Sequence, residues 1–217
     1  MISVEDIIQT ILWILAVLLS IAIHEYAHAQ YADWAGDPTP RSQGRVTLNP
    51  IAHLDPLGTL LIIIVAFLGY GIGWGKPVPV NPGYFRSPRR DWALCAFVGP
   101  LSNVVLAVLS ALLLRGLLLL EAVPLPSILI DFLLVMVLAN IGLALFNMIP
   151  LHPLDGSKVL SGFLPDVFDR RYWGFQMVYG PIILYSILIL PLIGLPNPLR
   201  YILLPMYEFF GKLLLGV

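Results

Sequence analysis

The chain has few charged residues for its length. Only 12% of its 217 residues are charged, about half the share of a soluble globular protein, whereas 59% are hydrophobic. A single cysteine, Cys95, excludes an internal disulfide and a cysteine-based metal cluster. The formal net charge of −1 supplies no basic surface for a polyanion, so we expect no nucleic-acid partner.

The apolar residues lie in runs long enough to cross a lipid bilayer, which takes about 20 residues. We therefore expect an all-α polytopic membrane protein with a single membrane-embedded domain over residues 1–217. The acidic start of the chain lacks the basic residues of a signal peptide, so the first run should be retained. Five runs predict helices: 7–31, 91–120, 127–149, 172–195 and 198–215.

Positive charges predict the orientation in the membrane. Basic residues gather in three loops, around 41–45, 76–90 and 158–171, whereas the loops at 121–127 and 195–198 have none. Loops rich in Lys and Arg stay on the cytoplasmic side. We expect a multi-pass protein of the plasma membrane with an extracytoplasmic N-terminus.

The apolar run 58–74 lies between two basic loops, which one crossing would place on opposite sides. It is too short for two crossings. We therefore predict five to six transmembrane helices, with 58–74 re-entering the membrane or packing obliquely; a true sixth span is the alternative. The prolines of 76–80 favour extended backbone, and the sequence allows a short extended hairpin there. That segment could pair with an unwound substrate strand, or serve only as a rigid connection.

Three ionisable side chains fall within five residues near the end of the first apolar run. Such groups are costly at membrane depth unless they have a function. His24 and His28 are four residues apart and lie on one helix face, where both can bind one zinc ion. Glu25 lies beside them and suits the role of general base. The motif predicts a hydrolytic metal site inside the membrane, toward the cytoplasmic side.

A catalytic zinc ion needs three protein ligands and one open position. Asp155 is the favoured third ligand, because the proline-rich stretch around it ends an apolar helix on the same side as His28. Two alternatives stay open: Asp155 could merely cap the helix that follows, and His152 could compete as a ligand. His53 is interpreted as a loop histidine, with an entry path or a second metal as its alternative roles.

Three motifs together resemble the site-2 protease family of intramembrane zinc metalloproteases. They are HEYAH at 24–28, GPLSN at 99–103 and the NxxPxxxLDG pattern at 147–156. The resemblance covers most of residues 15–160 and is to small prokaryotic members without a PDZ or CBS module. It implies one Zn²⁺ ion, Glu25 as base and Asp155 as ligand, in a catalytic core of about 7–160 followed by a helix pair at 172–215.

The chain departs from the family pattern in two places. Ser157 stands where a second glycine is common, and the run 58–74 looks like an addition. For Asn147, the resemblance suggests contact with the substrate backbone or the developing oxyanion, and the alternative is a hydrogen bond between helices. Asn103 and Asn140 are interpreted as helix-packing residues.

The predicted function is therefore zinc-dependent hydrolysis of peptide bonds in a membrane-spanning protein or peptide, near the cytoplasmic leaflet, as in regulated intramembrane proteolysis. A metal-ion transporter would need midplane ligands on several helices, but 172–215 is almost wholly apolar. A catalytically silent binding relative is the other alternative, and the presence of Glu25 argues against it. The sequence identifies neither the substrate nor the oligomeric state.

Overall fold

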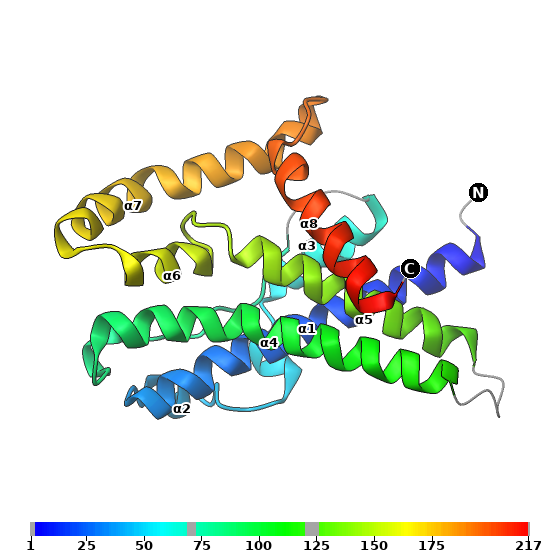
Figure 1. The fold of residues 1–217 in the computed structure, drawn as a ribbon, viewed down its shortest axis with the longest axis horizontal. Helices are drawn as coiled ribbons and strands as arrows, with labels where there is room; N and C mark the ends of the chain where they lie inside the picture. The colour runs from blue at the N-terminus through cyan, green and yellow to red at the C-terminus, as the bar shows by residue number, and fades with distance from the viewer. Residues whose placement is uncertain (1–2, 69–72, 120–125, 217) are drawn as a thin grey trace.

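The computed structural model describes residues 3–68, 73–119 and 126–216 (Figure 1). These ranges consist of helices and connecting loops, with one isolated antiparallel bridge, so the predicted all-α class is confirmed. The long helices are α1 (Val4–Ala35), α4 (Pro88–Leu119), α5 (Ser127–Asn147), α7 (Asp166–Ile189) and α8 (Pro198–Leu215). The shorter ones are α2 (Thr39–Ser42), η1 (Pro50–His53), α3 (Pro56–Leu68), η2 (Pro82–Tyr84), α6 (Asp155–Phe163) and η3 (Leu190–Ile193).

Four of the described helices are long and apolar enough to cross a membrane, namely α1, α4, α5 and α7. The 13 residues of α3 measure about 20 Å, less than the roughly 30 Å of a bilayer core. Helix α8 has 18 residues but carries Arg200, Glu208 and Lys212, and it is not among the four. The protein is a multi-pass membrane protein, and the predicted count of five to six spans is only approximate.

Helices α1, α4 and α5 pack against one another and form the core, with α8 across α5 (Figure 1). Small buried side chains such as Ala16, Ala29 and Ala107 let these helices approach closely. Large apolar side chains point outward instead, for example Leu112 on α4 and Met177 on α7. This distribution suits a bundle whose surroundings are lipid.

A buried polar network ties the three core helices together. Ser20 of α1, Asn103 of α4 and Asn140 of α5 are each fully buried. The Asn103 amide donates to Asn140 Oδ1, and the Asn140 amide donates to Ser20 Oγ, each at 2.8 Å. Interhelical hydrogen bonds of this kind contribute about 1 kcal/mol in membranes and require matched partners. They fix how the three helices are rotated toward one another.

The two ends of the apolar run 58–74 lie together. Leu54 and Gly75 form the antiparallel bridge, and the Lys76 N–H donates to the His53 carbonyl at 2.8 Å. Gly58 packs so tightly on Trp74 that an added Cβ would lie 2.1 Å from the Trp74 carbonyl oxygen. A chain that leaves and returns at one end of the bundle is what a re-entrant segment requires. Residues 69–72 of the run lie outside the described residues.

The segment 76–80 is extended but forms no strand in the described part of the chain, so the hairpin that the sequence allowed is not formed. It follows the bridge at Gly75 directly, and η2 begins soon after it, at Pro82. The prolines explain this outcome, because a residue without an N–H cannot donate to a ladder.

Single cysteines can test the re-entrant path. Leu48 and Tyr84 are exposed residues before and after the run, and Val4 is exposed at the opposite end of α1. With the buried Cys95 replaced by Ala, we expect Leu48→Cys and Tyr84→Cys to react with an impermeant maleimide from the same side of the membrane. Val4→Cys should react only from the other side. Labelling of positions 48 and 84 from opposite sides would establish a sixth span instead.

Candidate metal centre and active site

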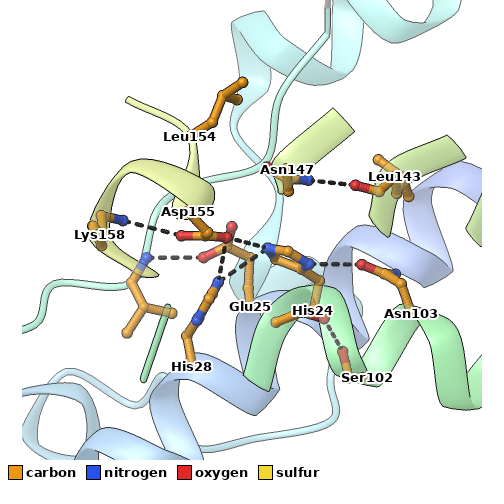
Figure 2. Close-up of polar contacts among 12 residues, drawn as sticks. His24, Glu25, His28, Ser102, Asn103, Leu143, Asn147, Leu154, Asp155 and Lys158 are labelled. Atoms are coloured by element: carbon orange, nitrogen blue, oxygen red, sulfur yellow. Dashed lines mark hydrogen bonds and ion pairs between the residues drawn. The ribbon is translucent and has the colours of Figure 1, made fainter. Parts of the chain in front are cut away.

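Three predicted ligands meet at one point between α1 and α6 (Figure 2). The Nε2 atoms of His24 and His28 are 3.0 Å apart, and each is 3.1 Å from Oδ2 of Asp155. All three side chains are buried. Within the described residues this is the one cluster of three or more His, Cys, Asp or Glu side chains whose donor atoms could share a metal ion.

The neighbours of the two imidazoles determine which ring nitrogen carries hydrogen. His28 Nδ1 lies 2.6 Å from the Cys95 carbonyl, and His24 Nδ1 lies 2.7 Å from Asn103 Oδ1. Both partners are acceptors, so both Nδ1 atoms donate, and the neutral rings direct their Nε2 lone pairs at each other and at Asp155. Three facing lone pairs repel unless a cation lies among them. Two imidazoles and a carboxylate, oriented by such partners, are a zinc-binding set.

Asp155 is the first residue of α6, and the turn before it is firmly held. Gln176 of α7 accepts from the His152 N–H at 2.8 Å and donates to the Pro150 carbonyl at 3.0 Å. At Gly156, an added Cβ would lie 2.2 Å from the Met148 carbonyl oxygen, so a side chain there would push α6 away. The proline-rich turn thus presents Asp155 to α1.

The second oxygen of Asp155 also has a partner. Lys158 Nζ donates to Asp155 Oδ1 at 3.1 Å and lies 5.4 Å from the centre of the Trp92 ring. This leaves Oδ2 for the histidines. Lys158 was not among the predicted site residues, although its position three residues after Asp155 on a helix was a usable signal.

Glu25 stands beside the three donors but is not one of them (Figure 2). Its Oε2 accepts the Val78 N–H at 3.0 Å. The carboxylate borders a cavity of about 720 Å³ whose walls come from α1, α4, α5, α6, α7 and the stretches 73–75 and 77–80. His24, His28, Asp155 and Asn147 line the same cavity, so a substrate group could reach all of them.

The three asparagines singled out from the sequence, at positions 103, 140 and 147, have different surroundings. Asn147 is half-buried, lines the cavity and donates from Nδ2 to the Leu143 carbonyl at 3.0 Å; its role in substrate binding stays a prediction. Asn140 belongs to the polar network of the core. Asn103 belongs to it too, but it also accepts from His24 at the metal centre, so the interpretation as a packing residue alone was incomplete.

The other two histidines lie outside the metal cluster. His53 is fully buried, donates from Nε2 to the Thr47 carbonyl at 2.8 Å, and burial lowers its pKa below the ordinary value. Its neighbour Asp55 accepts from the Gly58 N–H. The His152 ring packs edge-on against Trp173 of α7, and burial lowers its pKa as well. The structure places both rings in the framework around the site.

An apolar helical bundle that brings a zinc-type donor set and a nearby carboxylate to one cavity defines a membrane-embedded metallohydrolase. Comparison with known proteins narrows the class. The chain is 36% identical over 184 residues to "Putative zinc metalloprotease YwhC" of Bacillus subtilis, covering 82% of this chain and 80% of that one. It is 28% identical to "Putative zinc metalloprotease Rip2" of Mycolicibacterium smegmatis, over 74% of this chain and 62% of that one.

"Putative zinc metalloprotease Rip2" of Mycobacterium tuberculosis is 29% identical over 68% of this chain and 55% of its own length. No protein-family profile and no solved structure matches the chain. The extent and identity of the first match show that this chain belongs to the site-2 protease family, peptidase family M50. It is a multi-pass membrane zinc metalloprotease with zinc as its cofactor.

Gly99 of α4 offers a sharp test of the metal centre. An added Cβ at Gly99 would lie 2.3 Å from His28 Nε2 and 2.8 Å from His24 Cε1. We expect Gly99→Ala to displace both rings and to lower zinc affinity by about 10- to 100-fold, as loss of ligand orientation does. Zinc retention against a chelator measures it. Gly116→Ala, in the same helix with nothing within 4 Å, should bind zinc like the wild type. Equal affinities would contradict this geometry.

Proposed function

We propose that this protein is an intramembrane endopeptidase that hydrolyses peptide bonds of membrane-spanning substrates. His24, His28 and Asp155 hold one zinc ion in this proposal, and Glu25 is the general base. One observation carries it: a carboxylate that is not needed as a ligand faces the same cavity as three converging donors. The cavity lies within a bundle of apolar helices, which suits a substrate that is itself in the membrane.

The chain's own residues supply the remaining chemistry. Zinc, when bound, acts as a Lewis acid that polarises a peptide carbonyl and activates water. Glu25 accepts the proton of the attacking water and passes it to the leaving amine. The Val78 N–H holds one oxygen of Glu25, which orients the other toward the cavity. The Asn147 amide, on the cavity wall, suits contact with the substrate backbone or the developing oxyanion.

The active site belongs near the cytoplasmic leaflet in this proposal. His28 precedes the end of α1 at Ala35 by seven residues, or about 10 Å of helix. The same end of the bundle carries the basic loops, and Arg89 of α4 pairs there with Asp166 of α7. Loops rich in Lys and Arg stay in the cytoplasm, which places the N-terminus outside the plasma membrane.

We propose a single protease domain over residues 1–217. The catalytic core of about 7–160 contains every proposed ligand and the base. Helix α7 adds to it, because Leu184, Tyr185 and Leu188 line the cavity that holds Glu25. Of the C-terminal helix pair, α7 therefore forms part of the substrate cavity, whereas α8 packs against α5 and α4.

If Glu25 is the general base, replacing it should abolish most of the cleavage activity and leave zinc binding intact. Glu25→Gln should keep one zinc ion, because Glu25 is not a ligand, and should slow cleavage by about 10²- to 10⁴-fold. The measurement is zinc content together with cleavage of a single-span substrate in detergent. Glu208 is an exposed residue of α8, so Glu208→Gln is the matched control and should cleave normally. If the wild type binds zinc and cleaves nothing from a panel of substrates, the silent binding relative becomes the better description.

The substrate should need to unwind before it is cut. Carbonyl groups of a membrane helix are occupied by hydrogen bonds, and the extended segment 76–80 beside the cavity can pair with an unwound strand. We expect replacement of a Gly or Pro near the scissile bond by Leu to slow cleavage, with substrate binding much less affected. The same replacement two turns away is the control. Unchanged cleavage rates for the helix-stabilised substrate would contradict this requirement.

A further inference from the structure

We infer that Arg45 is a positioning residue that holds the segment 76–80 against the active site and, through Val78, holds Glu25. Arg45 lies in the loop after α2, outside the three motifs of the family resemblance. The inference deepens the proposed function and depends on it for the role given to Glu25. The contact geometry of Arg45 itself does not depend on that role.

Arg45 is a buried charge with an unusual set of partners. Only 4% of its surface is exposed. Nη1 donates to the Pro77 carbonyl at 3.1 Å, and Nη2 donates to the Lys76 carbonyl. No carboxylate lies within ion-pair distance in the described part of the chain. Burial of a cation without a carboxylate in direct contact is costly, so the two carbonyl contacts must be well formed. The planar guanidinium can engage both carbonyls at once, which a lysine ammonium does less well.

The backbone next to the Arg45 contacts, residues 77–79, has only one amide hydrogen. Pro77 and Pro79 have no N–H, so Val78 alone can donate. That N–H goes to Glu25 Oε2 at 3.0 Å. Arg45 therefore binds the acceptors, and Glu25 the donor, of one short piece of backbone. A shift of the segment at Arg45 moves the hydrogen bond at Glu25.

The far end of the segment is anchored from the same region of the chain. Asp37 is fully buried, and its Oδ2 accepts the Asn81 N–H at 2.6 Å while Oδ1 accepts the Thr39 N–H at 2.9 Å. Gly36 before it has φ +111°, which turns the chain away from α1 toward this position. The connection after the metal-binding helix thus holds the start of the segment through Arg45 and, through Asp37, the residue that directly follows its end. Of these contacts, the two made by Arg45 are the nearest in sequence to Val78.

The test compares Arg45→Met and Arg45→Lys with Arg41→Met. Arg41 is the matched control, because it lies in the same connection but is exposed and pairs with Asp33. Each variant is purified as the full chain and examined for zinc content, for kcat and KM on a single-span substrate, and for maleimide labelling. The labelling probe is Val80→Cys in a chain whose Cys95 is replaced by Ala.

We expect Arg45→Met to keep its zinc and to lose about 10- to 100-fold in kcat, the cost of a misplacement near 1 Å, with KM changed much less. In Arg45→Met, the cysteine at position 80 should react with maleimide several-fold faster than it does in the chain with Arg45 intact. Arg45→Lys should fall between Arg45→Met and the wild type in both measurements, and Arg41→Met should match the wild type.

Two results would overturn the inference: wild-type kcat with unchanged labelling in zinc-loaded Arg45→Met, or parallel loss of zinc and activity, which marks a general structural role. If Arg45→Met does not fold, kcat and maleimide labelling of Arg45→Lys decide between the same outcomes. If the parent chain cleaves no substrate, the proposed function fails, and the labelling of position 80 still decides whether Arg45 holds the segment.

Discussion

The arrangement of the protein depends on keeping three electron-pair donors face to face inside an apolar bundle. Two imidazole nitrogens and a carboxylate oxygen within about 3 Å repel one another without a cation, and each loses its water on burial. The chain meets this cost with partners behind the donors: the Cys95 carbonyl for His28, Asn103 for His24 and Lys158 for Asp155. The metal centre is therefore as much a property of α4 and α6 as of the helix that carries the motif.

The polar network of the core and the metal centre share one residue. Asn103 accepts from His24 with its oxygen and donates with its nitrogen to Asn140. Its amide is thereby oriented from both sides, and the rotation of α5 relative to α1 is linked to the tautomer of a zinc ligand. Gly99, one turn earlier on α4, gives the rings their space. The same stretch of α4 therefore has to allow close helix packing and orient the zinc ligands.

The sequence predicts those parts of the protein that have a local period or a local motif. The spacing of His24 and His28 requires only a helix, and the apolar runs require only a bilayer, so the all-α class and the zinc cofactor follow directly. The contacts of Asn103 and of the Val78 N–H depend on which helices and loops become neighbours, and no spacing encodes that. The span count is approximate for a related reason: the three charged residues of α8 are spread over its 18 residues, whereas the four of α7 lie within its first six and leave a long apolar stretch.

The hydrogen bonds that hold the segment 76–80 in place explain why the connection after α1 contains buried charged side chains. A loop at a membrane surface can satisfy its backbone with water, and Arg45 and Asp37 could remain solvated at little cost. Both are buried instead: Arg45 binds carbonyls of the segment beside the cavity, and Asp37 binds the N–H of Asn81, the residue that follows the segment. A proline-flanked strand next to a hydrolytic site has few backbone groups with which to hold itself in place. Side chains from a neighbouring connection supply the missing partners, and the only free amide hydrogen of 77–79 is thereby left for Glu25.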